Sequence, residues 1–240
     1  MKQQYKYMSK LLSKLLHKSY EESFRLCNES VLDLSATNPS AVMLDCGCND
    51  GSFTTRVAEK IGTKQIYGIE ISSASVKAQA LGIKTTSADL NSNLPYDDGM
   101  FDVIVANQLI EHLSNTDGFA REIKRTLKPG GYAIISTNNL SSWHNIVALV
   151  LGRQPFPSDI SNYTHIGKLV KIWGDGDAGS WSHLRVFTMH ALVKFFEHHG
   201  FVVKQNIGVG HYPFSGWISK FLSKIDKYHT AYVAIKVSKK

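Results

Sequence analysis

The sequence predicts an α/β fold with a doubly wound, mostly parallel sheet and helices on both faces. Two observations support this class. From residue 41 onward, short apolar runs of strand length alternate with segments of helical period, and the connections between them are short. The length of 240 residues, with 43% hydrophobic and 20% charged residues, suits one globular domain with a substantial core.

Two helical segments are expected first, over residues 5–17 and 20–34. Five lysines without an acid lie within residues 1–20, and their four-residue spacing places them on one helical face. This face is interpreted either as a contact with a membrane surface or anionic partner, or as a solvated face opposite an apolar stripe. Residues 1–36 are accordingly assigned to an N-terminal helical cap.

The first predicted strand covers residues 41–46, an apolar run that ends in a glycine-containing turn. Apolar residues then recur every four positions at Phe53, Val57 and Ile61, which predicts a helix. Gly62 follows the last of them and is expected to end this helix.

Three further strands are predicted at residues 65–70, 83–87 and 101–106. Between the first two, Ser72 is expected to be the N-cap of a helix that ends near Gly82.

After the fourth strand, apolar residues at Phe119, Ile123 and Leu127 predict another helix. The Lys-Pro-Gly-Gly sequence at 128–131 is expected to end it, and residues 132–137 form the fifth predicted strand.

The alternation stops between residues 138 and 187. A structureless loop of that length is improbable in a compact domain, so an inserted lid with one or two helices is predicted, the best candidate being residues 146–151.

The alternation of strands and helices resumes after residue 187. Thr188 is expected to cap a helix that Gly200 ends, and the remaining predicted elements are strand 201–207, helix 217–227 and strand 232–237.

Several protein classes are excluded by composition. No apolar run approaches the ~20 residues of a membrane-spanning helix, and the first residues lack the apolar stretch of a signal peptide. The three cysteines cannot all pair, and Cys46 and Cys48 have neither redox nor zinc spacing. A cytoplasmic location is therefore expected.

The net charge of +7 arises at the chain ends. Eight of the 27 lysines and arginines lie in residues 1–20 and 236–240, which contain no acid. The rest of the chain has 19 basic and 20 acidic residues, so a basic groove for nucleic acid is not predicted.

The chemistry is expected at the turn after the first strand, residues 44–51. Its glycines allow backbone to approach a ligand, but two of the three glycines of a dinucleotide fingerprint are missing, which argues against NAD or FAD. Glu70 ends the second predicted strand, beside the glycine turn, where a carboxylate can accept hydrogen bonds from both hydroxyls of a ribose. Asp89 follows the third predicted strand by about two residues. Together with Asp45, these residues place three acids at one edge of the sheet. Because phosphates would be repelled by this negative charge, the acids favour a nucleoside ligand without phosphates.

At this point the sequence resembles the class I S-adenosylmethionine-dependent methyltransferases, particularly those that act on small molecules. The similarity rests on five motifs in the family's order: LDCGCNDG at 44–51, IYGIE at 66–70, SADL at 87–90, FDVIVANQLIEHL at 101–113 and LKPGGYAIIST at 127–137. The resemblance implies a Rossmann-like, seven-stranded sheet whose last strand is antiparallel. It also implies a methyltransferase domain over residues 37–240 with the inserted lid 138–187.

The resemblance implies S-adenosyl-L-methionine as the cofactor. Asp45 and the glycine turn would hold its methionine portion, Glu70 the ribose and Asp89 the adenine amino group, while Asn107 would face the methionine portion or the acceptor. The residues expected to contact the cofactor are Asp45, Gly47, Cys48, Asn49, Gly51, Glu70, Ile71, Asp89, Leu90 and Asn107. Asn49 replaces a second glycine that is commoner in the family, and asparagine tolerates positive φ.

His112 is the candidate catalytic base, because a histidine accepts a proton near neutral pH. An orienting or packing role is the alternative. The ten histidines show no zinc spacing, so no metal is predicted. The motif of amino-directed nucleic-acid methyltransferases and the catalytic Pro-Cys pair are both absent from residues 106–109.

The lid is expected to bind the methyl acceptor, since it mixes aromatic and polar side chains as small-molecule pockets do. Its candidate residues are Trp143, His144, Tyr163, His165, Trp181, His183 and Arg185. Arg185 is assigned either to an anionic group of the acceptor or to an anchoring role.

The predicted function is methyl transfer to an O or N atom of a small metabolite or of a glycan- or lipid-linked intermediate. The basic N-terminal helix and the apolar stripe of residues 217–227 favour a membrane-adjacent substrate. Two alternatives are an RNA methyltransferase with phosphate-binding ends and a non-catalytic S-adenosylmethionine-binding regulatory or partner protein. The oligomeric state is not predicted.

Overall fold

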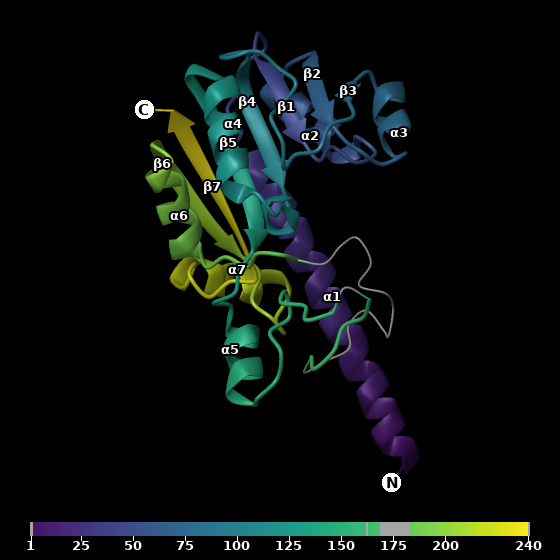
Figure 1. Cartoon of the computed structure of the whole chain (residues 1–240). Coiled ribbons are helices and arrows are strands. Elements are labelled where there is room, and N and C mark those ends of the chain that lie inside the picture. The colour runs from purple at the N-terminus through teal and green to yellow at the C-terminus, as the bar shows by residue number, and fades with distance from the viewer. Residues whose placement is uncertain (1, 162, 169–182, 240) are drawn as a thin grey trace.

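The computed structural model describes residues 2–161, 163–168 and 183–239, with side chains from residue 16 onward. Its seven strands form one sheet in the order β3-β2-β1-β4-β5-β7-β6 (Figure 1). The strands are β1 Val42–Cys46, β2 Gln65–Ile69, β3 Lys84–Thr86, β4 Phe101–Asn107, β5 Leu127–Asn138, β6 Phe201–Val209 and β7 Tyr232–Lys239. All seven predicted strands are therefore confirmed.

The first five strands in chain order pair in parallel, and β7 is antiparallel to both of its neighbours, as predicted. Asp45 on β1 lies beside Gly68 on β2 and Val105 on β4. The carboxyl ends of β1, β2 and β4 consequently meet at one edge of the sheet, which is where this class of fold binds ligands.

One strand starts earlier than predicted. Leu127 already pairs with Phe101, and the register shifts before Tyr132 pairs with Val103. Residues 128–131 therefore lie within β5 as an irregularity of the ladder, although the Pro-Gly-Gly sequence suggested a separate turn.

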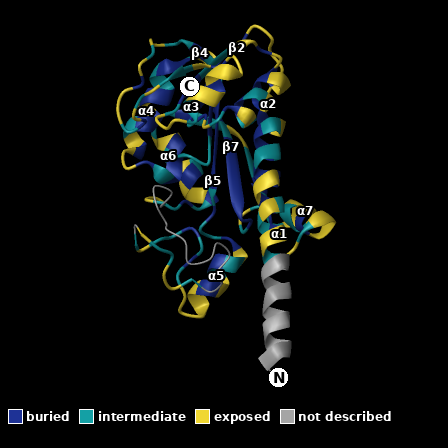
Figure 2. Ribbon diagram, turned by 90° about the vertical axis from the view of Figure 1, so that its right-hand side faces the viewer, coloured by how far each residue is buried: buried dark blue, intermediate teal, exposed yellow. Residues whose placement is uncertain are grey.

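Helices cover both faces of the sheet. Figure 2 shows α1 and α2 on one side of β5 and β7, with α4 and α6 on the other. Each pair buries its own apolar cluster, with Val31, Val57 and Ile61 on the first face and Phe119, Leu192 and Phe196 on the second. The helices are α1 Lys2–Leu34, α2 Ser52–Ile61, α3 Ser75–Ala80, the short η1 Ile110–His112, α4 Thr116–Thr126, α5 Trp143–Val150, α6 Met189–His198 and α7 Gly216–Ile225.

The two predicted N-terminal helices are one continuous helix, α1. No glycine or proline separates them, and Ser23 Oγ donates to the Ser19 carbonyl oxygen one turn earlier, so its hydroxyl is satisfied within the helix. Most of the lysines that form the predicted basic face have side chains outside the described residues. Val31 and Leu34 pack against β1 and α2, and the cap boundary at residue 36 stays a prediction.

Helix ends show which capping predictions hold. Gly62 ends α2 with φ of 86°, and Thr188 Oγ1 accepts a 3.1 Å hydrogen bond from the Ala191 N–H at the start of α6. The Ser72 prediction is wrong, because α3 begins at Ser75. Ser72 instead forms a turn in which its carbonyl oxygen accepts from the Ser75 N–H at 3.2 Å.

The predicted lid helix exists as α5, which begins at Trp143, three residues earlier than expected. Figure 1 shows α5 and the following segment beyond the carboxyl ends of β4 and β5. Among the described helices, none combines the length and the apolar character needed to cross a bilayer.

Candidate functional site

A turn with three left-handed residues connects β1 to α2. Gly47, Asn49 and Gly51 have φ of 78°, 47° and 80°. Asparagine accepts this conformation better than most residues, so the departure from glycine at Asn49 is accommodated. At Gly51 a Cβ atom would lie 2.6 Å from Ile83 Cδ1 and 2.9 Å from Ala78 Cα, so only glycine fits.

Glu70 joins this turn to the end of β2. Its Oε2 accepts a 3.0 Å hydrogen bond from the Asn49 N–H, and its Oε1 accepts a 2.7 Å bond from the Ser72 N–H. A carboxylate has about four acceptor positions, so each oxygen can still accept another hydrogen bond. The predicted adjacency of Glu70 and the glycine turn is therefore present.

Asp45 lies beneath the turn with 3% of its surface exposed. Its Oδ2 accepts a 2.6 Å hydrogen bond from Thr54 Oγ1 on α2. Burial raises the pKa of the Asp45 carboxyl to about 7, although the Thr54 hydrogen bond lowers it. Within the described part of the chain, no cation pairs with this carboxylate, so a bound cationic group would stabilise its ionised form.

Three residues extend the edge beyond β2 and β3. Ile71 is 71% exposed, which leaves an apolar side chain available next to Glu70. Asp89 is exposed, and its Oδ1 accepts hydrogen bonds of 2.9 Å from the backbone N–H and the side chain of Asn91. Leu90 is nearly buried at 9% exposure. These positions provide an acidic acceptor and an apolar surface at the same edge.

The side chains of the glycine turn are not all directed toward the edge. Cys48 is buried against Ala78 and Ile83, and burial raises the pKa of its thiol to about 12. All three cysteines are free and buried, as expected for packing residues that are not nucleophiles.

Asn107 ends β4 and its amide is held from two sides. Its Nδ2 donates to Asn28 Oδ1 on α1 at 2.8 Å, and its Oδ1 accepts from Ser136 Oγ on β5. The next residue, Gln108, has a left-handed φ of 53°, which is uncommon for a residue other than glycine. The backbone thus turns sharply where the fourth strand ends.

Beyond this turn, Glu111, His112 and His183 come together. The rings of His112 and His183 have centroids 4.9 Å apart. Glu111 is 1% exposed and accepts a 2.9 Å hydrogen bond from Thr137 Oγ1. Burial raises the pKa of Glu111 to about 7 and lowers that of His183. Glu111 is not among the site residues predicted from the sequence. Its position next to His112, shortly after a predicted strand end, could have indicated that it belongs to the site.

The other predicted lid residues do not converge on His183. Trp143 Nε1 donates to Asp226 Oδ2 at 2.9 Å, which directs the indole toward α7. His144 packs on the Tyr212 ring at 4.7 Å, and Tyr163 is 80% exposed. Arg185 donates to the carbonyl oxygens of Leu184 and Ser114, which agrees with an anchoring position. Trp181 lies outside the described residues.

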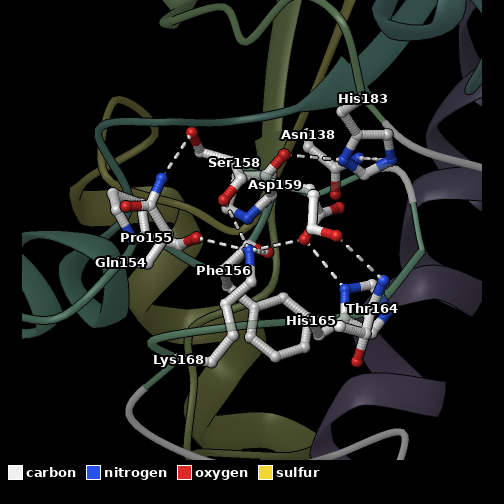
Figure 3. Close-up of polar contacts among 12 residues, drawn as sticks. Asn138, Gln154, Pro155, Phe156, Ser158, Asp159, Thr164, His165, Lys168 and His183 are labelled. Carbon is white, nitrogen blue, oxygen red and sulfur yellow. Dashed lines mark hydrogen bonds and ion pairs between the residues drawn. The ribbon is translucent and has the colours of Figure 1, made fainter. Parts of the chain in front are cut away.

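A network around Lys168 holds the described lid loop (Figure 3). Lys168 Nζ donates to the carbonyl oxygens of Pro155, Phe156 and Ser158 at 2.7–2.9 Å. It also pairs with Asp159 Oδ1 at 2.9 Å, and the side chains of this pair are only 6% and 5% exposed. His165 Nδ1 contacts the same carboxylate oxygen at 2.8 Å, so its observed role is within the loop.

A separate basic hollow of about 560 Å³ lies between the ends of α4, α6 and β7. Two of its charged side chains are engaged within the protein: Lys124 Nζ donates to the His199 carbonyl oxygen, and Arg125 pairs with Glu122 and Asp98. It is at the opposite edge of the sheet from the glycine turn, so we do not assign it to the site.

The sheet order, the left-handed glycine turn and the carboxylate that bridges it to β2 define a nucleoside-binding α/β protein of the Rossmann-like class. Residues 19–206 match the family described as "Methyltransferase domain". The chain belongs to this family, the class I S-adenosylmethionine-dependent methyltransferases, whose cofactor is S-adenosylmethionine.

Similar proteins include enzymes named for N- and O-methyl transfer. The chain is 35% identical to norajmaline N-methyltransferase from Rauvolfia serpentina over 123 residues, 48% of this chain and 41% of that enzyme. It is 23% identical to a ubiquinone biosynthesis O-methyltransferase from Bradyrhizobium sp. (strain ORS 278) over 178 residues, 72% of this chain and 63% of that enzyme. The chain thus spans less than two thirds of the length of either relative.

Among solved structures, the fold is similar to a Thermotoga maritima protein described as an S-adenosylmethionine-dependent methyltransferase and possible histamine N-methyltransferase. The TM-score is 0.60 at 18% identity, over 95% of this chain and 100% of that chain. At this identity the similarity establishes the fold.

Proposed function

We propose that this protein transfers the methyl group of S-adenosylmethionine to an oxygen or nitrogen atom of a small molecule. The observation that carries the proposal is the Glu70 carboxylate, which is hydrogen-bonded to the glycine turn and retains acceptor capacity on both oxygens. Such a carboxylate matches the two hydroxyls of a ribose.

The residues at the sheet edge fit the rest of the cofactor. Asp45 is buried without a cationic partner among the described residues, which suits the cationic methionine portion. Ile71 exposes an apolar side chain that suits an adenine face, and Asp89 can accept a hydrogen bond from its amino group. We assign Gly47, Cys48, Asn49, Gly51, Leu90 and Asn107 to the same site through their positions in or beside the turn and strand ends.

The cofactor supplies a methyl group already activated by its sulfonium. The protein therefore has to hold the acceptor in line with that methyl group and exclude water. A proton acceptor is needed only when the acceptor atom carries a proton that must leave. The sequence predicts this proton-accepting role for His112.

The acceptor is proposed to enter between the end of β4 and the lid. Among the described lid residues, His183 approaches His112, and His144 lies in the same inserted segment against Tyr212. The N- and O-methyltransferase names of the relatives support an oxygen or nitrogen acceptor. The exposed apolar stripe of α7 supports a membrane-adjacent acceptor such as a glycan- or lipid-linked intermediate.

The test is methyl transfer from isotopically labelled S-adenosylmethionine to panels of amines, phenols, carboxylated metabolites and glycans. We expect a labelled small-molecule product from wild type and from Glu59→Ala, an exposed α2 control. We expect at least tenfold less product from Glu70→Ala when the cofactor is below saturation. Labelled RNA in a parallel incubation would favour the RNA methyltransferase alternative. Cofactor binding without transfer to any acceptor would favour the non-catalytic alternative.

A further inference from the structure

We propose that Glu111, His112 and His183 bind one divalent transition-metal ion, such as Zn²⁺, Co²⁺ or Mn²⁺, beside the expected acceptor position. A carboxylate oxygen of Glu111 and one ring nitrogen of each histidine all lie within 4.8 Å of one another. In a tetrahedral site, ligand atoms about 2.1 Å from the metal ion are about 3.4 Å apart, so side-chain rotations that bring the three atoms closer together are needed to complete the site.

The backbone holds the two segments that supply these ligands. Glu111 and His112 lie on η1, which directly follows the turn after β4. The Glu111 carbonyl oxygen accepts hydrogen bonds from the Leu184 N–H at 2.8 Å and from the Arg185 N–H at 3.0 Å. These two bonds fix the lid at the residues next to His183, so the third ligand is positioned by main-chain contacts.

The His183 ring is oriented as metal-binding histidines are. Its Nδ1 lies 2.8 Å from the Pro157 carbonyl oxygen, which can only accept, so Nδ1 carries the proton. Nε2 therefore presents its lone pair to the cluster. A hydrogen bond from the second ring nitrogen to a backbone carbonyl is the usual outer contact of a histidine ligand.

The Glu111 carboxylate is also held from one side. Thr137 Oγ1 donates to Oε2 at 2.9 Å, and Asn138 Nδ2 lies 3.4 Å from Oε1. The same Nδ2 atom is 3.4 Å from His183 Nε2. Both contacts exceed normal hydrogen-bond length. Rotation of the Asn138 amide by 180° would replace Nδ2 with an oxygen, a further ligand for a cation at this point.

Charge favours a cation in this position. Glu111 is 1% exposed, and within residues 16–161, 163–168 and 183–239 it makes no ion pair. A buried carboxylate without a cation loses hydration with little compensation. Two imidazoles and one carboxylate suit Zn²⁺, Co²⁺ and Mn²⁺ and leave coordination positions open for a substrate atom.

The role of the metal site rests on the proposed function, because the ion would position the acceptor of the methyl group. An acceptor that offers an oxygen or nitrogen lone pair would bind the open position and be held at the end of β4. The cation would also lower the pKa of a coordinated hydroxyl, so His112 would act as a ligand and not as the base.

The experiment is titration of the metal-free full chain with Co²⁺, followed by visible absorption, and equilibrium dialysis with Zn²⁺. We expect one ion per chain, with at least about 100-fold weaker affinity in His183→Ala and in Glu111→Gln. His190→Ala, which changes an exposed histidine of α6, should retain wild-type affinity. Circular dichroism and cooperative thermal unfolding establish that each variant is folded.

Absence of stoichiometric metal binding by folded wild type would overturn the proposal, as would equal affinity in His183→Ala and wild type. Because the titration contains no cofactor or acceptor, its outcome is separate from that of the proposed function. Metal binding in a protein that fails to bind S-adenosylhomocysteine would leave the metal site standing and reject the methyltransferase proposal.

Discussion

The carboxylates at the carboxyl edge of the sheet differ because their surroundings differ. Asp45 is buried beneath the glycine turn, Glu70 accepts two backbone hydrogen bonds, and Asp89 is exposed in a turn of its own. Three residues of the same charge can therefore serve three parts of one nucleoside ligand. The Asp45 carboxyl also makes the affinity for the cofactor depend on pH.

Cofactor affinity is expected to rise with pH because Asp45 has a pKa of about 7. The ionised carboxylate, which pairs with the ammonium group of the ligand's amino acid portion, forms as the pH increases through that value. If only this form binds, affinity for S-adenosylhomocysteine should increase about tenfold between pH 6 and pH 8. Calorimetric titration at both values tests this. Asp45→Asn should remove the dependence, and an unchanged dependence in that variant would assign it to another group.

The free energy of unfolding of glycine variants shows whether the glycine turn is closely packed. Gly51→Ala should lower the free energy of unfolding by about 2–4 kcal/mol, since it combines left-handed strain with overlap against Ala78 and Ile83. Gly82→Ala is the control, because Gly82 has φ of 83° and no heavy atom within 4 Å of an added Cβ. It should cost only about 1 kcal/mol. Equal losses in urea unfolding would show that overlap at Gly51 is relieved.

At the scale of elements, periodicity and capping chemistry predict the sheet and its helices well. Most strands are short apolar runs, which is why their positions could be predicted. The order of the strands was not predicted, and the antiparallel direction of the last strand was expected from the family resemblance. Predictions that depended on local polar geometry were less successful. Ser72 is a serine before a helix, yet the backbone makes an additional turn and α3 starts at Ser75.

The lid shows why part of the site could not be predicted. Its contacts join residues far apart in sequence, such as His183 to His112 and Arg185 to the Glu111 carbonyl oxygen, and no periodic pattern encodes them. The carboxyl-edge acids could be predicted because parallel strands bring their ends together. The position of an irregular segment instead depends on individual hydrogen bonds, including those of Lys168.

Lys168→Met should loosen the lid without unfolding the sheet. The substitution leaves Asp159 buried without its ammonium partner and removes three hydrogen bonds to backbone carbonyls. We expect faster proteolytic cleavage within residues 154–168 and a higher KM for the acceptor, with cofactor affinity unchanged. Lys194→Met breaks an exposed pair with Glu197 and should alter neither property. Wild-type cleavage rates in Lys168→Met would show that other contacts hold the loop.

For the whole molecule, the exposed surface of α7 is expected to promote binding to anionic membranes. Trp217, Phe221 and Ile225 are 77%, 55% and 68% exposed, and the helix carries Lys220 and Lys224 without an acid. Sedimentation with phosphatidylglycerol vesicles should exceed that with phosphatidylcholine vesicles and weaken at high salt.

Trp217→Ala should reduce vesicle binding about tenfold, because a large apolar side chain no longer enters the interface. Leu81→Ala, at an exposed apolar position after α3, should not. Equal binding to both vesicle types would exclude the electrostatic contribution, and no binding to either would exclude a membrane-adjacent substrate reached through this surface.

The central claim is that the carboxyl edge of the sheet binds S-adenosylmethionine through Glu70, and calorimetric titration with S-adenosylhomocysteine tests it most directly. We predict micromolar affinity for wild type and for the exposed control Glu59→Ala, at least tenfold weaker binding by Glu70→Ala, and no binding of NAD. Folded wild-type protein that does not bind S-adenosylhomocysteine, or Glu70→Ala protein that binds it as wild type does, would contradict this claim.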